Sequence, residues 1–121
     1  VDFAFPTHSQ ISVLKGLTMT LKPGQSLAIV GLSGSGKSTI MALLQQFYNP
    51  DKGVITIDGL NIDDMDMQFV RERFFGCVPQ DIVLFGGTIK ENIMYGKTNA
   101  TDEEVIEAAK KANAHSFISG F

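Results

Sequence analysis

Hydrophobic and polar positions alternate along this chain with two different periods, which separate the expected strands from the expected helices. Alternation with a period of two predicts strands over residues 1–5 and 17–21. Continuous apolar stretches predict two more strands, at residues 27–30 and 54–57. The first of these is expected to be covered on both faces in a parallel sheet. A last strand is expected over residues 75–78.

Apolar residues at helical spacing predict four helices between and after these strands. The first is expected to begin near Lys37 and has its apolar residues between Ile40 and Phe47, and a short helix follows Asp66, whose carboxylate can cap it. Two further helices are expected to begin at Thr88 and Thr101, because each threonine stands three residues before a glutamate, as in a capping box. The buried face of the last helix is predicted to consist of Val105, Ile106, Ala109 and Ala112.

Composition restricts the possible partners and the place of this protein in the cell. The chain has 121 residues, the length of one domain or of part of a larger one. Its net charge of -3 argues against a surface for nucleic acid or for anionic lipid. The single cysteine, Cys77, excludes an internal disulfide, and its apolar neighbours predict that it lies in the core. No apolar run approaches the ~20 residues of a membrane span, so a cytosolic environment is the default expectation.

The strongest chemical signal is a glycine-rich loop at residues 31–38, which fits G-x-x-x-x-G-K-[ST] between an expected strand and an expected helix. Glycines let the backbone bend tightly and aim N–H groups at phosphate oxygens, and the helix start adds its positive dipole end. Lys37 can reach the β- and γ-phosphates, and Ser38 offers a hydroxyl to Mg²⁺. The residues predicted to bind nucleotide in this region are Gly31, Ser33, Gly34, Ser35, Gly36, Lys37, Ser38 and Thr39.

The loop indicates nucleotide phosphates but neither the base nor the reaction. Neither an N-K-x-D stretch for guanine nor a D-x-x-G switch occurs, which disfavours a GTPase. One alternative is a small P-loop kinase, which would need its own Mg²⁺ carboxylate and an acceptor site in this chain. Another alternative is a non-catalytic product that binds ATP without turnover.

An ordered set of motifs along essentially the whole chain resembles the nucleotide-binding domain of ATP-binding cassette (ABC) transporters, most closely the exporter group. In chain order the matching segments are Phe3-Ala4-Phe5-Pro6, Val13 to Leu17, Lys22-Pro23-Gly24, Gly31 to Thr39, Phe47-Tyr48-Asn49-Pro50, Val78-Pro79-Gln80-Asp81, Leu84-Phe85, Thr88 to Ile93 and Tyr95-Gly96. The resemblance implies an α/β fold of the P-loop NTPase (RecA-like) type. Residues 1–80 would form an antiparallel β subdomain and the P-loop core through the Q-loop, and residues 81–121 the start of the helical subdomain.

The resemblance also implies roles for two residues outside the loop, with ATP and Mg²⁺ as cofactors. Phe5 stands where the family stacks an aromatic ring, more often tyrosine, on adenine; the alternative is a simple aromatic residue of a strand. Gln80 stands at the Q-loop, where its amide is expected to bind Mg²⁺ or the attacking water and to sense the membrane domain. Lys37 and Gln80 are therefore the expected catalytic residues.

The same resemblance implies parts that this sequence does not contain. It has no L-S-G-G-Q signature, no strand ending in Asp-Glu after Gln80 and no switch histidine, and Asp58 is expected to be a turn residue. We therefore expect an incomplete domain that binds ATP with little or no hydrolysis. Poor stability is also expected, because residues 27–30 would lack sheet neighbours. The parent would be an integral membrane exporter with transmembrane domains and a second nucleotide-binding domain as partners, and this part would lie at the cytoplasmic face.

Overall fold

The computed structural model describes all residues from 1 to 121 and divides them into two compact units, Val1–Gly76 and Cys77–Phe121. Each unit has its own helices and its own packing, and each is described by itself below. No helix in either unit combines the length with the apolar composition that a bilayer span requires.

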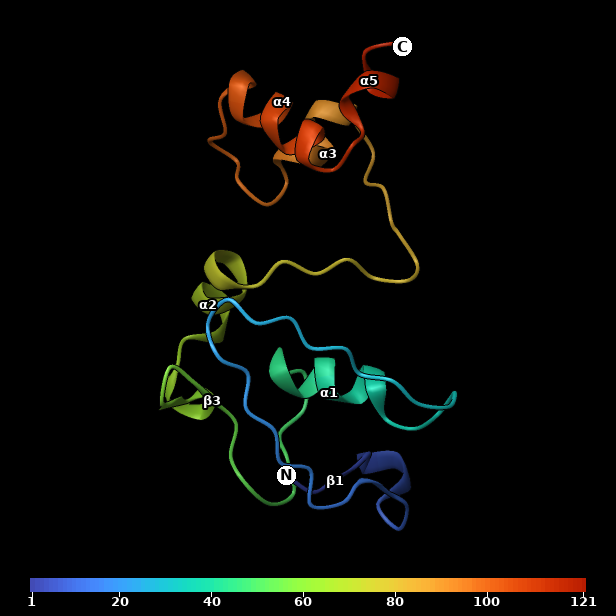
Figure 1. The fold of residues 1–121 in the computed structure, drawn as a ribbon, viewed down its shortest axis with the longest axis vertical. Helices are drawn as coiled ribbons and strands as arrows, with labels where there is room; N and C mark the ends of the chain where they lie inside the picture. The colour runs from blue at the N-terminus through green and yellow to red at the C-terminus, as the bar shows by residue number, and fades with distance from the viewer. The chain divides into compact units, whose positions relative to one another are not determined.

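The first unit consists of two short antiparallel strand pairs and their helices (Figure 1). Its elements are β1 (Phe3–Ala4), η1 (Pro6–His8), β2 (Ser12–Leu14), α1 (Lys37–Leu44), β3 (Thr56–Ile57), β4 (Leu60–Asn61), η2 (Ile62–Asp64) and α2 (Met67–Phe74). Strand β1 pairs with β2, and β3 pairs with β4. Asp58 and Gly59 join the second pair, both with positive φ, as a tight two-residue hairpin turn requires. The predicted turn at Asp58 is confirmed.

Two hydrophobic clusters hold the first unit together. In one, Phe3 and Leu14 from the paired strands pack with Ile40 and Leu43 of α1, so the strand pair supports the helix that follows the glycine-rich loop. The buried residues of the other cluster are Ile62, Met67 and Val70. Half-buried Ile55 packs against both clusters and thereby joins them.

The second unit contains three helices, α3 (Ile89–Met94), α4 (Asp102–Lys111) and α5 (His115–Ile118). Both predicted capping boxes are confirmed. The Thr88 hydroxyl accepts from the Glu91 N–H at 3.1 Å, and the Glu91 carboxylate accepts from the Thr88 N–H at 2.7 Å. Thr101 and Glu104 repeat the arrangement at 3.3 and 3.0 Å. In the first unit, Asp66 caps α2 as predicted.

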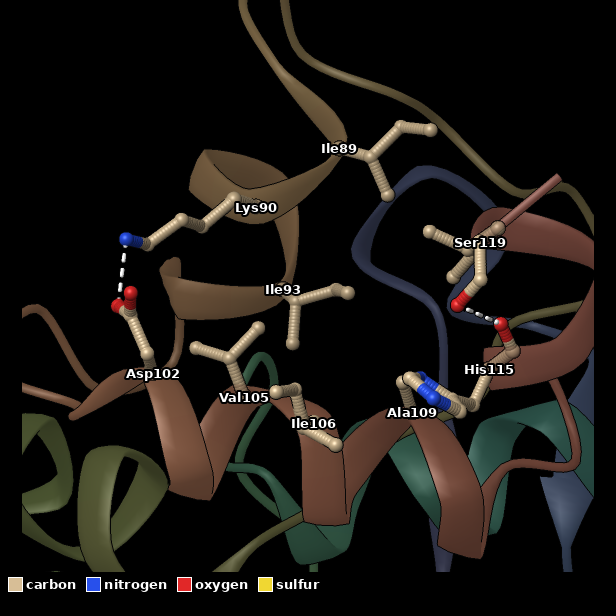
Figure 2. A pocket seen from close by; sticks show the side chains of 10 residues that line it. Ile89, Lys90, Ile93, Asp102, Val105, Ile106, Ala109, His115 and Ser119 are labelled. Carbon is tan, nitrogen blue, oxygen red and sulfur yellow. Dashed lines mark hydrogen bonds and ion pairs between the residues drawn. The ribbon is translucent and has the colours of Figure 1, made fainter. Parts of the chain in front are cut away.

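An apolar groove of about 350 Å³ lies between the three helices of the second unit. Figure 2 shows Ile93 of α3 facing Val105 and Ile106 of α4 across this groove. At its edge the Lys90 ammonium and the Asp102 carboxylate form an ion pair of 2.5 Å between α3 and α4. The helices are therefore joined by apolar packing and by an exposed ion pair.

Three of the five predicted strands are wrong. Residues 17–21, 27–30 and 75–78 belong to no strand, and Figure 1 draws these stretches as plain coil. Val30 is 91% exposed and Val78 is 90% exposed. A strand forms only where a neighbouring segment pairs with its backbone, and no segment of this chain builds a ladder with these three. The apolar composition of these three segments was therefore not enough to make them strands.

The other predicted elements exist but are shorter or shifted. The first strand is limited to Phe3–Ala4, because Pro6 begins η1, and the strand at residues 54–57 is limited to Thr56–Ile57. Helix α1 starts at Lys37, as predicted, but ends at Leu44, so Phe47 lies beyond it and is 60% exposed.

Two predictions of burial also need correction. Cys77 is exposed and does not belong to the core, because no layer of structure covers the irregular segment that carries it. On α4, Val105 and Ala109 are buried as predicted, whereas Ile106 and Ala112 are exposed. With only short helices to pack against, α4 buries a narrower face than its apolar pattern indicates.

Candidate functional site

The glycine-rich loop leads directly into α1 through two left-handed glycines. The Ser35 N–H donates to the Leu32 carbonyl at 3.2 Å, which closes a tight bend. Gly34 has φ +80° and Gly36, the N-cap residue of α1, has φ +89°. A residue with a side chain is strained in this region, whereas glycine is not. The two glycines therefore allow the chain to turn sharply into the helix.

Side chains lie close to two glycines of this loop. A Cβ atom on Gly31 would lie 2.6 Å from the Ser35 hydroxyl oxygen. A Cβ atom on Gly36 would lie 3.0 Å from Leu14 and 3.1 Å from Val13, both in β2. The end of the loop is thus seated directly on β2 and the cluster beneath it.

The ammonium of Lys37 lies over the loop. Its Nζ atom donates to the carbonyl of Gly31 at 2.8 Å and to the carbonyl of Leu32 at 2.6 Å. The side chain therefore folds back across the bend from the first turn of α1. A positive charge is held where the loop backbone curves.

Three amide groups of the same loop have no hydrogen-bond acceptor within the chain, although Gly36 is buried. The N–H groups of Ser33, Gly34 and Gly36 donate to no carbonyl or side chain of the chain. The first turn of α1 has no intrahelical acceptor for its own N–H groups, and it carries the positive end of the helix dipole. Together with the Lys37 ammonium, these donors suit an anion with several oxygens, such as the phosphates of a nucleotide.

The two hydroxyl residues after Lys37 differ in exposure. Ser38 is exposed in the first turn of α1, where its hydroxyl is accessible to an ion bound at the loop. Thr39 is only 6% exposed and belongs to the buried face of α1. Of the two, Ser38 is the more accessible to a ligand.

Phe5 belongs to a group of three aromatic side chains in the first unit. Its ring meets the ring of Phe3 edge-on with centroids 5.1 Å apart, and the ring of Tyr48 edge-on at 5.3 Å. The ring is half-buried and packs against the cluster that contains Ile40 of α1. Phe5 is therefore a packing residue that still keeps part of its surface open.

Gln80 belongs to the second unit, on the irregular segment before α3. The residue is exposed, and its side chain makes no hydrogen bond within the chain. No group of three or more histidine, cysteine, aspartate or glutamate side chains gathers to form a metal site. The predicted role of Gln80 towards Mg²⁺ stays a prediction.

The sequence matches the ABC transporter family over residues 14–119. The chain belongs to this family. It is 54% identical over its whole length to ABC transporter B family member 4 of Dictyostelium discoideum, of which it covers 16%. It is 48% identical over its whole length to the mitochondrial potassium channel ATP-binding subunit of Rattus norvegicus, of which it covers 17%. The chain thus spans about a sixth of the length of these relatives.

Two residues near the site of this ABC transporter chain were missed by sequence reasoning. Tyr48 completes the aromatic group around Phe5, and Arg71 of α2 donates to carbonyls just beyond the end of α1. Neither contact follows from local spacing, because the partners are far apart in the sequence. In the sequence the Phe47-Tyr48 pair marks a motif but no contact with Phe5, and nothing local distinguishes Arg71 from the nearby Arg73.

Proposed function

We propose that residues 31–38 bind ATP with Mg²⁺ and that the chain forms part of the ATP-binding domain of an ABC exporter. The observation that carries the proposal is the Lys37 ammonium, held over the bend beside loop amides that have no acceptor. Membership of the ABC transporter family supports a nucleotide as the anion and disfavours the kinase alternative.

In this proposal Lys37 exchanges the carbonyls of Gly31 and Leu32 for β- and γ-phosphate oxygens. The free N–H groups of the loop bind the same phosphates, and Phe5 stacks on adenine. Ser38 would hold Mg²⁺, which when bound neutralises phosphate charge, and Gln80 would bind Mg²⁺ in the assembled transporter. Lys37 and Gln80 are the chain's catalytic residues in the assembled transporter.

The proposal extends to the domain and its partners. Residues 1–80 form the β subdomain and the RecA-like core through the Q-loop, and residues 81–121 begin the helical subdomain. ATP binding and hydrolysis drive transport once transmembrane domains and a second nucleotide-binding domain are present, with this part at the cytoplasmic face of the membrane. The names of the relatives support this reading, because they include B-family ABC transporters and an ATP-binding subunit.

Titration calorimetry with Mg·ATP tests the proposal. Wild type is expected to bind, and Lys37→Ala is expected to lose most of that binding. Lys15→Ala is the matched control, because Lys15 is an exposed lysine whose side chain makes no hydrogen bond or ion pair. A wild type that does not bind Mg·ATP, or equal affinity in wild type and Lys37→Ala, would contradict the proposal.

A further inference from the structure

The C-terminal end of α1 is closed by a regular backbone motif. The Gln46 N–H donates to the Leu43 carbonyl at 3.0 Å, and the Phe47 N–H donates to the Ala42 carbonyl at 2.9 Å. Gln46 is left-handed, with φ +53°, as the residue after the C-cap is in a Schellman motif. The motif satisfies the Ala42 and Leu43 carbonyls, but the carbonyls of Gln45, the C-cap residue, and of Gln46 after it accept no backbone N–H.

Arg71 of α2 supplies donors to these two carbonyls. Its Nε atom donates to the Gln45 carbonyl at 2.8 Å, and its Nη2 atom donates to the Gln46 carbonyl at 3.3 Å. The guanidinium carbon also lies 5.2 Å from the centre of the Phe47 ring. Arg71 takes part in none of the ion pairs of the chain. Its charge is therefore directed at the negative end of the α1 dipole.

Arg71 sits on a helix that is itself firmly held. Asp66 caps α2, and Met67 and Val70 are buried in the second hydrophobic cluster. A second link reaches the same end of α1, because the Gln46 side-chain amide donates to the Asp63 carboxylate at 3.1 Å. The end of α1 is thus attached to a packed part of the first unit.

Helix α1 is short enough for one end to influence the other. It has eight residues, which corresponds to about 12 Å, and its first turn carries Lys37 and Ser38. An isolated helix of this length is marginal in water. If α1 frayed from its C-terminal end, binding of an anion at its N-terminal end would have to order the whole helix. The loss of conformational entropy would then weaken anion binding.

We propose that Arg71 is a positioning residue for nucleotide binding. Its guanidinium holds the C-terminal end of α1, so the first turn at Lys37 is ordered before the phosphates arrive. Arg71 itself touches neither phosphate nor base. The inference rests on the proposed function, because it assigns Arg71 to the same phosphate site.

Two substitutions at Arg71 and one matched control test this inference in the 121-residue chain. Arg71→Met removes the charge and both donors but keeps an unbranched side chain, and Arg71→Lys keeps the charge but loses the fork of the guanidinium. Arg73→Met is the control, because Arg73 is exposed on the same helix and makes no hydrogen bond or ion pair. Mg·ATP affinity is expected to fall about threefold to tenfold in Arg71→Met, less in Arg71→Lys and not in Arg73→Met.

Amide hydrogen exchange separates positioning from a general loss of stability. Faster exchange in α1, with α2 still protected, is expected for Arg71→Met. If Arg71→Met and Arg73→Met have equal Mg·ATP affinity and equal amide exchange in α1, this inference is overturned but the proposed function is not. If Arg71→Met does not fold, Arg71→Lys decides: weaker binding than Arg73→Met supports the inference, and equal binding overturns it. A wild type that does not bind Mg·ATP overturns the proposed function and this inference together.

Discussion

The ammonium of Lys37 donates a hydrogen bond to the carbonyl of Gly31 at 2.8 Å, so the last part of the glycine-rich loop is tied to its first residue. The same side chain is the one proposed to bind phosphate. A phosphate oxygen is charged and forms stronger hydrogen bonds than a neutral carbonyl does. A phosphate oxygen bound at the loop would therefore compete successfully with this carbonyl for the Lys37 ammonium.

The first prediction concerns the shape of this cation. Lys37→Arg keeps the positive charge but replaces a compact ammonium with a wide planar guanidinium. The ammonium lies within a tight bend, 2.8 and 2.6 Å from the Gly31 and Leu32 carbonyls, and a wider guanidinium would not reach the phosphates from the same place. We expect Mg·ATP affinity, measured by calorimetry, to fall at least about tenfold, or ~1.4 kcal/mol. Wild-type affinity in Lys37→Arg would indicate that only net charge matters at this position.

The second prediction compares two glycines of the loop. Both Gly34 and Gly36 are left-handed, but a Cβ atom on Gly34 meets nothing within 4 Å, whereas on Gly36 it lies 3.0 Å from Leu14. Gly34→Ala should lower the free energy of unfolding by about 1 kcal/mol through backbone strain alone, and Gly36→Ala by more than that, because the Leu14 and Val13 side chains must also move aside. Hydrogen exchange of the α1 amides in the two variants measures the difference. Equal exchange in both would show that the contact with β2 is unimportant.

The third prediction separates the two roles of Phe5. Phe5→Leu keeps an apolar side chain against Phe3 and Tyr48 but removes the flat ring. Stacking on adenine would be lost, at a cost of about 0.5–1.5 kcal/mol, while phosphate binding would remain. We expect weaker binding of ATP and unchanged binding of inorganic tripolyphosphate by calorimetry. If both ligands weaken equally, Phe5 acts through packing against the cluster under α1.

The fourth prediction concerns the response of the second unit to acid. The pKa of Glu91 is lowered from its usual 4.5, first by the hydrogen bond from the Thr88 N–H and then by the one from the Thr88 hydroxyl. The pKa of Glu104 is lowered by the hydrogen bond from Lys97 and then by that from the Thr101 N–H. Each lowered pKa contributes stability above the unfolded value, which is lost as the pH falls below 4.5 through the folded value.

Circular dichroism during an acid titration measures this loss of helix. The variant Glu91→Gln, Glu104→Gln keeps side-chain oxygens that complete capping boxes but cannot titrate. Its helix content should therefore change less between neutral pH and pH values below 4.5 than that of wild type. Identical titration curves for the two proteins would exclude the capping glutamates as the source of the acid response.

Helix starts could be predicted from the sequence because their causes are local. Asp66, Thr88 and Thr101 each cap a helix within three residues of themselves. The loop could be predicted for the same reason, since its glycines and Lys37 are neighbours in the chain. Strands were predicted less well, because an apolar segment such as residues 27–30 forms no strand unless another segment pairs with it.

The supporting contacts of the site also lay beyond sequence reasoning. The aromatic group joins Phe5 to Tyr48, and the Arg71 guanidinium reaches Gln45 across 26 positions. Such contacts depend on how the first unit packs, which no periodicity encodes. Cys77 was predicted to be buried because its neighbours are apolar, yet it is exposed. Apolar neighbours lead to burial only where other helices or strands pack over them.

Amide chemical shifts of the isotope-labelled chain during titration with Mg·ATP show whether the glycine-rich loop binds the phosphates. We expect the N–H signals of Ser33, Gly34 and Gly36 to move first and furthest, and these movements to disappear in Lys37→Ala. Shifts confined to other residues, or loop shifts that persist unchanged in Lys37→Ala, would contradict phosphate binding at this loop.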